Sequence, residues 1–127
     1  MKFLSNEYKT YINSNGWKKS VRRKIALRLL LGRDPIIPLL AATEVEHLSY
    51  SRIDFKRCRG YEIPFLDIIG MNRVTHRNIV TPVKDSLRKL FGRKLGNAIM
   101  ANFLRGCLLF WYAVALSSML FFASIQS

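Results

Sequence analysis

The chain has 127 residues, half of them hydrophobic, and its 21 Lys and Arg against 8 Asp and Glu give a net charge of +13. This length excludes a multidomain protein, and the hydrophobic residues outside the C-terminal run are too few for a well-stabilised domain. The charge divides into two basic blocks, residues 1–33 and 83–105, around a neutral segment, residues 34–82. Basic blocks of this kind bind phosphate, whether it belongs to lipid or to RNA.

The N-terminal block predicts one short amphipathic helix. Residues 1–16 are polar with scattered aromatic side chains and end in a turn. Ser20 can cap a helix that Gly32 ends, with Val21 and Ile25 on its apolar stripe. Such a helix could lie on an anionic membrane surface, pack on a partner protein, or act as an import signal that we expect to stay uncleaved. The basic residues of this helix region are Lys18, Lys19, Arg22, Arg23, Lys24 and Arg28.

The charge-neutral middle segment, residues 34–81, is predicted to be helical and irregular. Asp34 followed by Pro35 is typical of a helix start, and we expect that helix to run to about Phe55. Gly and Pro then recur at short intervals over residues 58–72, so this stretch is expected to be irregular, with a short strand only weakly indicated.

No motif in the sequence identifies a catalytic, metal or cofactor site. Glu44 and His47 have the Glu-x-x-His spacing of di-iron carboxylate proteins, but His76 lacks the matching acid. We therefore expect the pair to lie on a solvated helix face, and we expect no metal, no cofactor and no enzymatic activity. The chain also has no phosphate-binding loop, dinucleotide fingerprint or nucleophile elbow. Cys58 and Cys107 are interpreted as free thiols, because a disulfide would join a polar surface to an apolar segment.

Residues 82–105 predict a basic juxtamembrane helix. Thr81 and Pro82 repeat the pattern of a cap followed by proline, and apolar residues then recur at helical spacing. The helix is expected to continue into the C-terminal segment, either unbroken or with a kink near Gly92 and Gly96. Its basic side chains are expected to bind the headgroups of anionic lipid, including cardiolipin. These residues are Lys84, Arg88, Lys89, Arg93, Lys94 and Arg105.

Residues 106–127 predict a C-terminal transmembrane helix. The stretch from Gly106 to Ile125 contains no ionisable side chain, and at about 1.5 Å per residue it spans about 30 Å, the thickness of a bilayer's hydrocarbon core. Positive charges on its N-terminal side place the body on the cytoplasmic, matrix or stromal face. Small and polar residues lie within about 40° of one direction on this helix and are expected to pack against a neighbouring transmembrane helix. They are Asn102, Gly106, Ala113, Ser117 and Ser124.

The sequence thus predicts a mainly α protein, with a small irregular and helical basic body followed by a long C-terminal helix that ends as a single transmembrane span. The expected function is that of a non-catalytic accessory subunit of a large membrane complex, either a respiratory-chain or an ATP synthase complex of the mitochondrial inner membrane. The body would lie in the matrix and the C-terminus at the intermembrane-space face. Expected partners are neighbouring transmembrane and soluble subunits and anionic lipid such as cardiolipin, with no small-molecule substrate.

Two other functions and two other membranes are alternatives. The basic blocks also suit a membrane-tethered RNA-binding component of an organellar ribosome. A stand-alone tail-anchored adaptor or viral membrane protein is the second alternative. The endoplasmic reticulum and a chloroplast membrane are the alternative locations.

Overall fold

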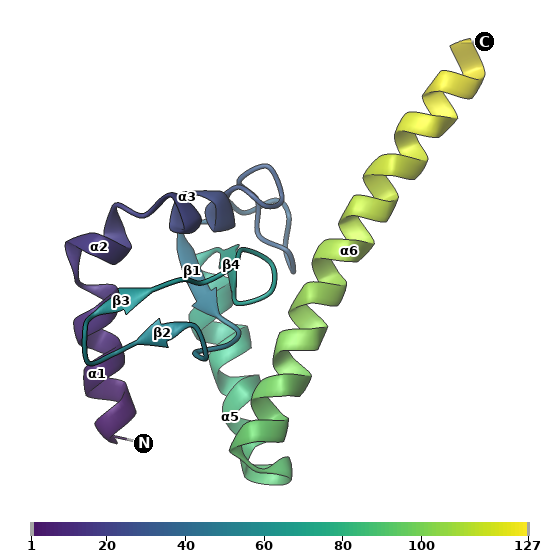
Figure 1. The fold of residues 1–127 in the computed structure, drawn as a ribbon. Coiled ribbons are helices and arrows are strands. Elements are labelled where there is room, and N and C mark those ends of the chain that lie inside the picture. Colours follow the sequence, from purple (N-terminus) through teal and green to yellow (C-terminus); the bar gives the residue numbers. More distant parts are fainter. Residues whose placement is uncertain (1, 127) are drawn as a thin grey trace.

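The computed structural model describes residues 2–126 and places a small mixed body beside one long helix (Figure 1). About 59% of the chain is helical, so the prediction of a mostly helical chain with a long C-terminal helix is confirmed, but the body is partly strand. The elements in chain order are α1 (Lys2–Ile12), α2 (Asn15–Lys18), α3 (Val21–Leu27), β1 (Glu44–His47), β2 (Ile53–Asp54), β3 (Arg59–Gly60), β4 (Ile68–Met71), α4 (Arg73–Thr75), the π-helix η1 (His76–Val80), α5 (Thr81–Phe91) and α6 (Arg93–Gln126).

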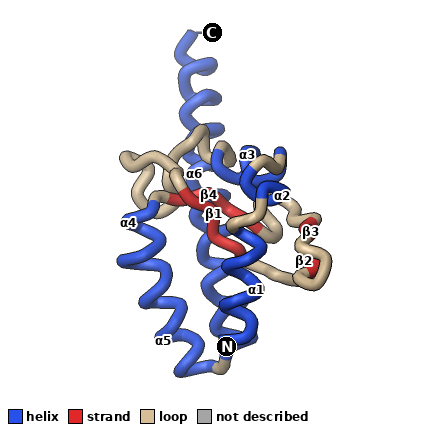
Figure 2. Tube along the Cα trace, turned by 90° about the vertical axis from the view of Figure 1, so that its left-hand side faces the viewer, coloured by secondary structure: helices blue, strands red, loops and turns tan. Residues whose placement is uncertain are grey.

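Two short antiparallel ribbons form the centre of the body. β1 pairs with β4 in a register that places Val45 opposite Gly70 and His47 opposite Ile68, and β2 pairs with β3. Figure 2 shows how small these strands are beside the helices. In Figure 1, α1 and α2 lie on one side of the strands and α6 on the other.

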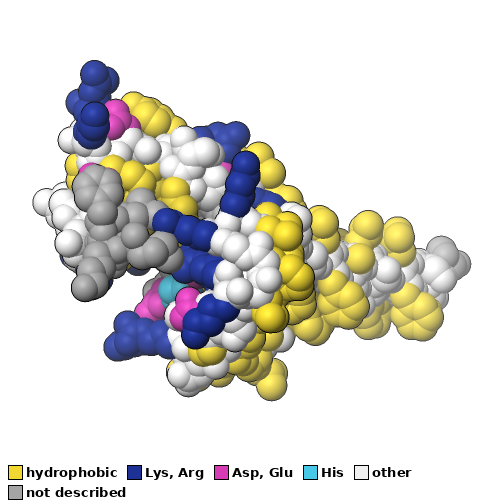
Figure 3. Space-filling view, turned by 90° about the horizontal axis from the view of Figure 1, so that it is seen from below, with side chains coloured by type: hydrophobic (Ala, Val, Ile, Leu, Met, Phe, Trp, Pro, Cys, Tyr) yellow, Lys and Arg dark blue, Asp and Glu magenta, His cyan; other side chains and the backbone are white. Residues whose placement is uncertain are grey.

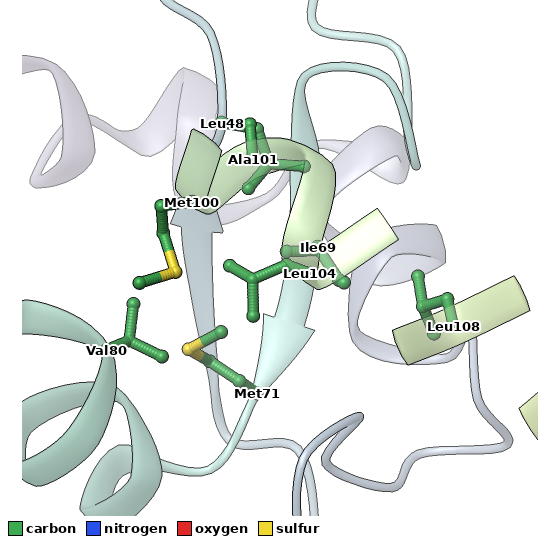
Figure 4. Close-up of a cluster of buried hydrophobic side chains, with 8 residues drawn as sticks. All are labelled: Leu48, Ile69, Met71, Val80, Met100, Ala101, Leu104 and Leu108. Carbon is green, nitrogen blue, oxygen red and sulfur yellow. The ribbon is translucent and has the colours of Figure 1, made fainter. Parts of the chain in front are cut away.

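β4 divides the interior into two hydrophobic clusters, because its successive side chains point to opposite faces. Ile69 and Met71 join the cluster that packs on α6, and Ile68 joins a cluster with Tyr11 and residues of α2 and α3. At Gly70 a Cβ would come within 2.6 Å of a backbone oxygen of α3, so glycine permits the close approach of that helix. The α6 cluster contains Leu48, Ile69, Met71, Val80, Met100, Ala101, Leu104 and Leu108 (Figure 4).

A continuous helical run extends from α4 through η1 to α5, and it begins earlier than predicted. Asn72 caps it by accepting a hydrogen bond from the backbone N–H of Val74 at 2.9 Å. The expected cap, Thr81, instead has helical dihedral angles. Pro82 cannot donate a backbone hydrogen bond, and the turn before it widens into a π-helix in which the N–H of Thr81 donates to the carbonyl of His76.

A sharp reversal at Gly92 separates α5 from α6, so the expected unbroken or kinked helix is wrong. Gly92 has a φ of 86°, a left-handed conformation that ends α5. At Gly96 a Cβ would lie 2.7 Å from the backbone nitrogen of Arg88, which explains why glycine is needed where the two helices meet. The two glycines therefore close a helical hairpin within one chain.

The helix expected over residues 35–55 is also wrong. The carboxylate of Asp34 accepts hydrogen bonds from the N–H groups of Ile36 and Ile37 at 2.8 and 2.7 Å, as a helix cap would. These bonds close a turn instead, because Pro38 has no N–H with which to continue a helix. The chain then enters β1, where pairing with β4 overrides any local preference for helix.

Candidate functional site

α6 consists of two parts with different surroundings. We call residues 93–112 its body half and residues 113–126 its outer half. In the body half several side chains are buried against the rest of the chain, whereas every side chain of the outer half is exposed. Among the described residues, α6 is the one helix long and apolar enough to cross a membrane. Figure 3 shows the projecting helix without the basic and acidic side chains that cover the body.

The body packs against α6 through apolar contacts and also forms hydrogen bonds with it. Leu104 and Leu108 are buried in the α6 cluster. Near the middle of the helix the indole Nε1 of Trp111 donates to the carbonyl of Pro35 at 2.8 Å. Three residues before Leu108 on the same helix, the Nε of Arg105 donates to the carbonyl of Phe65 at 3.2 Å. Contacts thus fix α6 to the body up to the end of the body half.

The predicted packing face of α6 points away from the body. At about 100° per residue, the buried residues Ala101, Leu104 and Leu108 centre on one direction, and the small residues centre about 160° from it. All five small residues are exposed. Body contacts and the small-residue face therefore occupy largely opposite sides of one helix, with Gly106 at the edge of a hollow that Pro35 and Ile36 of the body also line. The small-residue face comprises Asn102, Gly106, Ala113, Ser117 and Ser124.

The six residues expected to bind lipid headgroups do not form one site. Arg105 lies beside the candidate span, but Lys84 is buried in the body, where its ammonium donates to Glu46 at 2.7 Å. The other four lie at or near the turn between α5 and α6, at the end of α6 far from the C-terminus (Figure 1). Thirteen residues, or about 20 Å of helix, separate Arg93 from Gly106. The four are Arg88, Lys89, Arg93 and Lys94.

The predicted amphipathic helix is shorter and turned differently than expected. Ser20 caps it as predicted, accepting from the N–H of Arg23 at 3.3 Å, but it ends at Leu27. Ala26 faces the body, while Val21 and Ile25 are exposed. Among the basic residues, Lys18, Lys19, Lys24 and Arg28 are exposed, Arg23 is half-buried, and Arg22 points inward to a carboxylate.

Glu62 is the centre of a first polar network, buried between α1, α3 and β1. Its carboxylate accepts hydrogen bonds from the hydroxyl of Tyr11, the Nε of Arg22 and the Nε2 of His47, each at 2.7 Å. The Nδ1 of His47 bonds the hydroxyl of Tyr8 at 2.9 Å. Burial alone would raise the pKa of Glu62, but the three donors outweigh it and lower the pKa to about 2. The carboxylate is thus charged, and both of its oxygens accept hydrogen bonds from side chains of the same chain.

Glu46 is the centre of a second polar network, on the side of the body that faces α5. Its two oxygens contact the Nζ of Lys84 at 2.7 Å and the Nε2 of His76, and the Nδ1 of His76 donates to Glu44 at 2.7 Å. Burial would raise the pKa of Glu46, but His76 and Lys84 lower it to about 2. Burial would lower the pKa of His76, but the two carboxylates raise it. The network ties β1 to η1 and α5.

The Glu-x-x-His pair does not form a shared site. It lies on β1 and not on a helix, and residues three apart in a strand point to opposite faces. Glu44 therefore joins the second polar network and His47, which is buried and not solvated, joins the first. Within residues 2–126 no group of three or more His, Cys, Asp and Glu has the arrangement of a metal site. Cys58 and Cys107 are free, as predicted.

No family model, no curated protein and no solved structure matches the chain. The geometry alone therefore defines the class. It is a small mixed α/β body packed along the first part of one long helix, Arg93–Gln126, which is a candidate single membrane span.

Proposed function

We propose that the protein is a non-catalytic accessory subunit of a large membrane complex, anchored by α6 and contributing to the assembly and stability of that complex. The complex we propose is a respiratory-chain or ATP synthase complex of the mitochondrial inner membrane, with the body in the matrix. One observation carries the proposal: the small-residue face of α6 lies opposite the side that holds the body.

A face of this kind suits a neighbouring transmembrane helix. In lipid, helices associate through close backbone approach and packing, which small residues allow. Because no body residue covers the outer half of α6, a second helix can lie along Ala113 and Ser117 without displacing the body. Both ends of the protein would then be held, one by its own fold and the other by the complex.

The ionisable groups inside the body also support a scaffolding role. The carboxylates of both polar networks are bound by cationic or hydroxyl groups of the same chain, which fixes β1, α3 and α5 relative to one another. Exposed basic side chains over the body leave it attractive to the phosphates of a negatively charged membrane.

The test compares two double variants of the same residue types. Ala113→Leu with Ser117→Leu enlarges the small-residue face, and Ala115→Leu with Ser118→Leu adds the same bulk on the opposite side of the outer half. Membranes from cells expressing each variant are solubilised mildly, treated or not with RNase, and separated on a native gel. We expect only the first variant to lose its place in a high-mass, RNase-resistant band, with both variants still membrane-inserted.

Each alternative function gives a different gel. Normal incorporation of the first variant would overturn the packing face. A high-mass band that RNase removes would assign the basic residues to RNA and replace the accessory-subunit proposal. Migration of the unmodified protein as a monomer would overturn membership in any complex and favour the tail-anchored adaptor.

A further inference from the structure

The loop between α3 and β1, residues 28–43, is an ordered unit joined to the body. Arg33 and Ala41 form an antiparallel bridge that closes it. Inside it lies the fully buried carboxylate of Asp34, which binds two N–H groups of the loop and also accepts from the N–H of Asn72 at 2.7 Å. These contacts hold the backbone of the loop in one conformation against the body.

Two leucine side chains of this loop are exposed on the surface of the protein. Leu31 is 94% exposed and Leu39 is 89% exposed, and Ile37 beside them is also exposed. Leu31 has a φ of 54°, in the left-handed region that L-residues with a side chain disfavour. The ordered loop thus exposes large apolar side chains, and at Leu31 it does so from a strained backbone. Such an exposed apolar surface indicates a site of contact with an apolar environment.

The loop lies against α6 within the charge-free stretch. Trp111 bonds the carbonyl of Pro35, and the hydroxyl of Tyr112 donates to the carbonyl of Leu29. Trp111 and Tyr112 lie five and six residues after Gly106, where that stretch begins, which is about 8–9 Å along the helix. Amphipathic elements that lie on bilayers bury their apolar faces about 5–10 Å deep. The loop is thus at the depth of the headgroup and outer acyl region.

We propose that this loop is a second membrane-contacting element, with Leu31 and Leu39 inserted into the leaflet on the body side, next to α6. The inference rests on α6 spanning a bilayer, which is part of the proposed function. It does not depend on any partner subunit. The occupant of the apolar surface is lipid, because the surface is continuous with a helix of membrane-spanning composition.

The charges around the leucines complement such a surface. Arg28 and Arg33 are exposed on either side of Leu31 in the chain. Their aliphatic stems can follow the apolar surface while the guanidinium groups reach lipid phosphates, with which they form strong paired hydrogen bonds. In this proposal the two arginines bind headgroups together with Arg105, the member of the predicted headgroup set that adjoins the charge-free stretch of α6.

An apolar hollow lies between the loop and α6. It measures about 500 Å³ and lies between Pro35 and Ile36 of the loop and Phe103 and Phe110 of α6. In water these side chains would remain exposed around an unfilled groove. In a bilayer, acyl chains fill such a groove, so the contact between loop and helix becomes one continuous surface toward lipid.

The test uses the full chain reconstituted in vesicles of phosphatidylcholine and phosphatidylglycerol. Cys58→Ser and Cys107→Ser provide a background for the single replacements Leu31→Cys, Leu39→Cys, Leu90→Cys and Leu116→Cys. Each cysteine carries an environment-sensitive fluorophore, and its emission maximum and quenching by iodide are measured. Leu116 lies in the outer half, and Leu90 is exposed on α5 near the turn.

We expect positions 31 and 39 to show at least half of the blue shift and at least half of the protection from iodide found at position 116. Position 90 should show neither. If positions 31 and 39 behave like position 90 while position 116 is protected, the loop inference is overturned and the anchor stands. If position 116 is as accessible to iodide as position 90, α6 does not span the bilayer, and the anchor and the loop inference fail together. All four positions are exposed, so the replacements leave the core unchanged.

Discussion

The two halves of α6 belong to one uninterrupted helix but differ in what stabilises them. The body half buries Leu104 and Leu108 and donates hydrogen bonds from Arg105 and Trp111 to the body. The outer half buries no side chain in the protein. Both halves are continuous α-helix, but the body half carries three basic side chains and the outer half carries no ionisable side chain. The body half therefore depends on this chain's own fold, and the outer half depends on its surroundings.

The largest expected effect comes from removing the carboxylate around which the body is organised. Glu62→Ala should lower the free energy of unfolding of the body by about 3–5 kcal/mol, because the buried His47 and the partly buried Arg22 would then lose their shared acceptor. Urea unfolding of the detergent-solubilised chain, followed by tryptophan fluorescence, measures this change. The matched control is Asp85→Ala, whose largely exposed carboxylate contacts Arg88 only at 3.8 Å and should change stability by less than about 0.5 kcal/mol. Equal effects would show that the first polar network does not organise the body.

The comparison between the halves can be tested with one substitution type at two positions. Leu104→Ala should cost the body about 2–5 kcal/mol, because it removes a fully buried side chain from the α6 cluster. Leu116→Ala, in the outer half, should leave the same unfolding transition within about 0.5 kcal/mol of the unsubstituted protein. A large loss at position 116 in detergent would mean that the outer half contributes to the fold of the body and that the division is wrong.

The pH dependence of stability sharpens the role of the buried acids. The pKa of Glu62 is about 2 in the folded protein and 4.5 as its ordinary value, so its contribution to stability is complete above pH 4.5 and is lost as the pH falls toward 2. Between pH 7 and pH 3 the loss from this carboxylate should be about 2 kcal/mol. The raised pKa of His76 acts with the opposite sign, since its contribution is complete below pH 6.5 and is lost as the pH rises through the raised value. Unfolding midpoints of the protein and of Glu62→Gln across this range should converge at low pH, and parallel curves would contradict the assignment.

The outer part of the molecule was the part that the sequence predicted best. The length and composition of a charge-free apolar stretch are read directly from neighbouring residues, so the local sequence is sufficient to predict a candidate span. The Ser20 cap is a second local inference that is confirmed. The free thiols, inferred from the different surroundings of the two cysteines, are confirmed as well. The body was predicted poorly because its elements depend on distant partners. β1 forms through pairing with β4, and Arg22 turns inward because Glu62, forty residues away, is buried there.

A signal for the polar networks was present in the composition. The chain has only eight acidic residues against 21 basic ones, and four of the eight, Asp34, Glu46, Glu62 and Asp67, are buried. In so basic a chain, a carboxylate inside an otherwise apolar stretch such as residues 61–69 indicates a structural ion pair more than a solvated face. The partners could not be assigned from sequence, because any of many arginines and lysines could have filled that role.

The smallest expected effect concerns a buried polar group of the body that has no hydrogen-bond partner among the described residues. Thr75 is fully buried at the end of α4, and its hydroxyl has no hydrogen-bond partner among residues 2–126. A buried hydroxyl without a partner is destabilising, and valine has nearly the same shape without that group. Thr75→Val should therefore raise the free energy of unfolding by about 1 kcal/mol, measured by the same urea transition. The control Thr10→Val, at an exposed position of α1, should stay within about 0.5 kcal/mol. A loss of stability at Thr75 would contradict this expectation and would mean that the hydroxyl contributes favourably to the fold of the body.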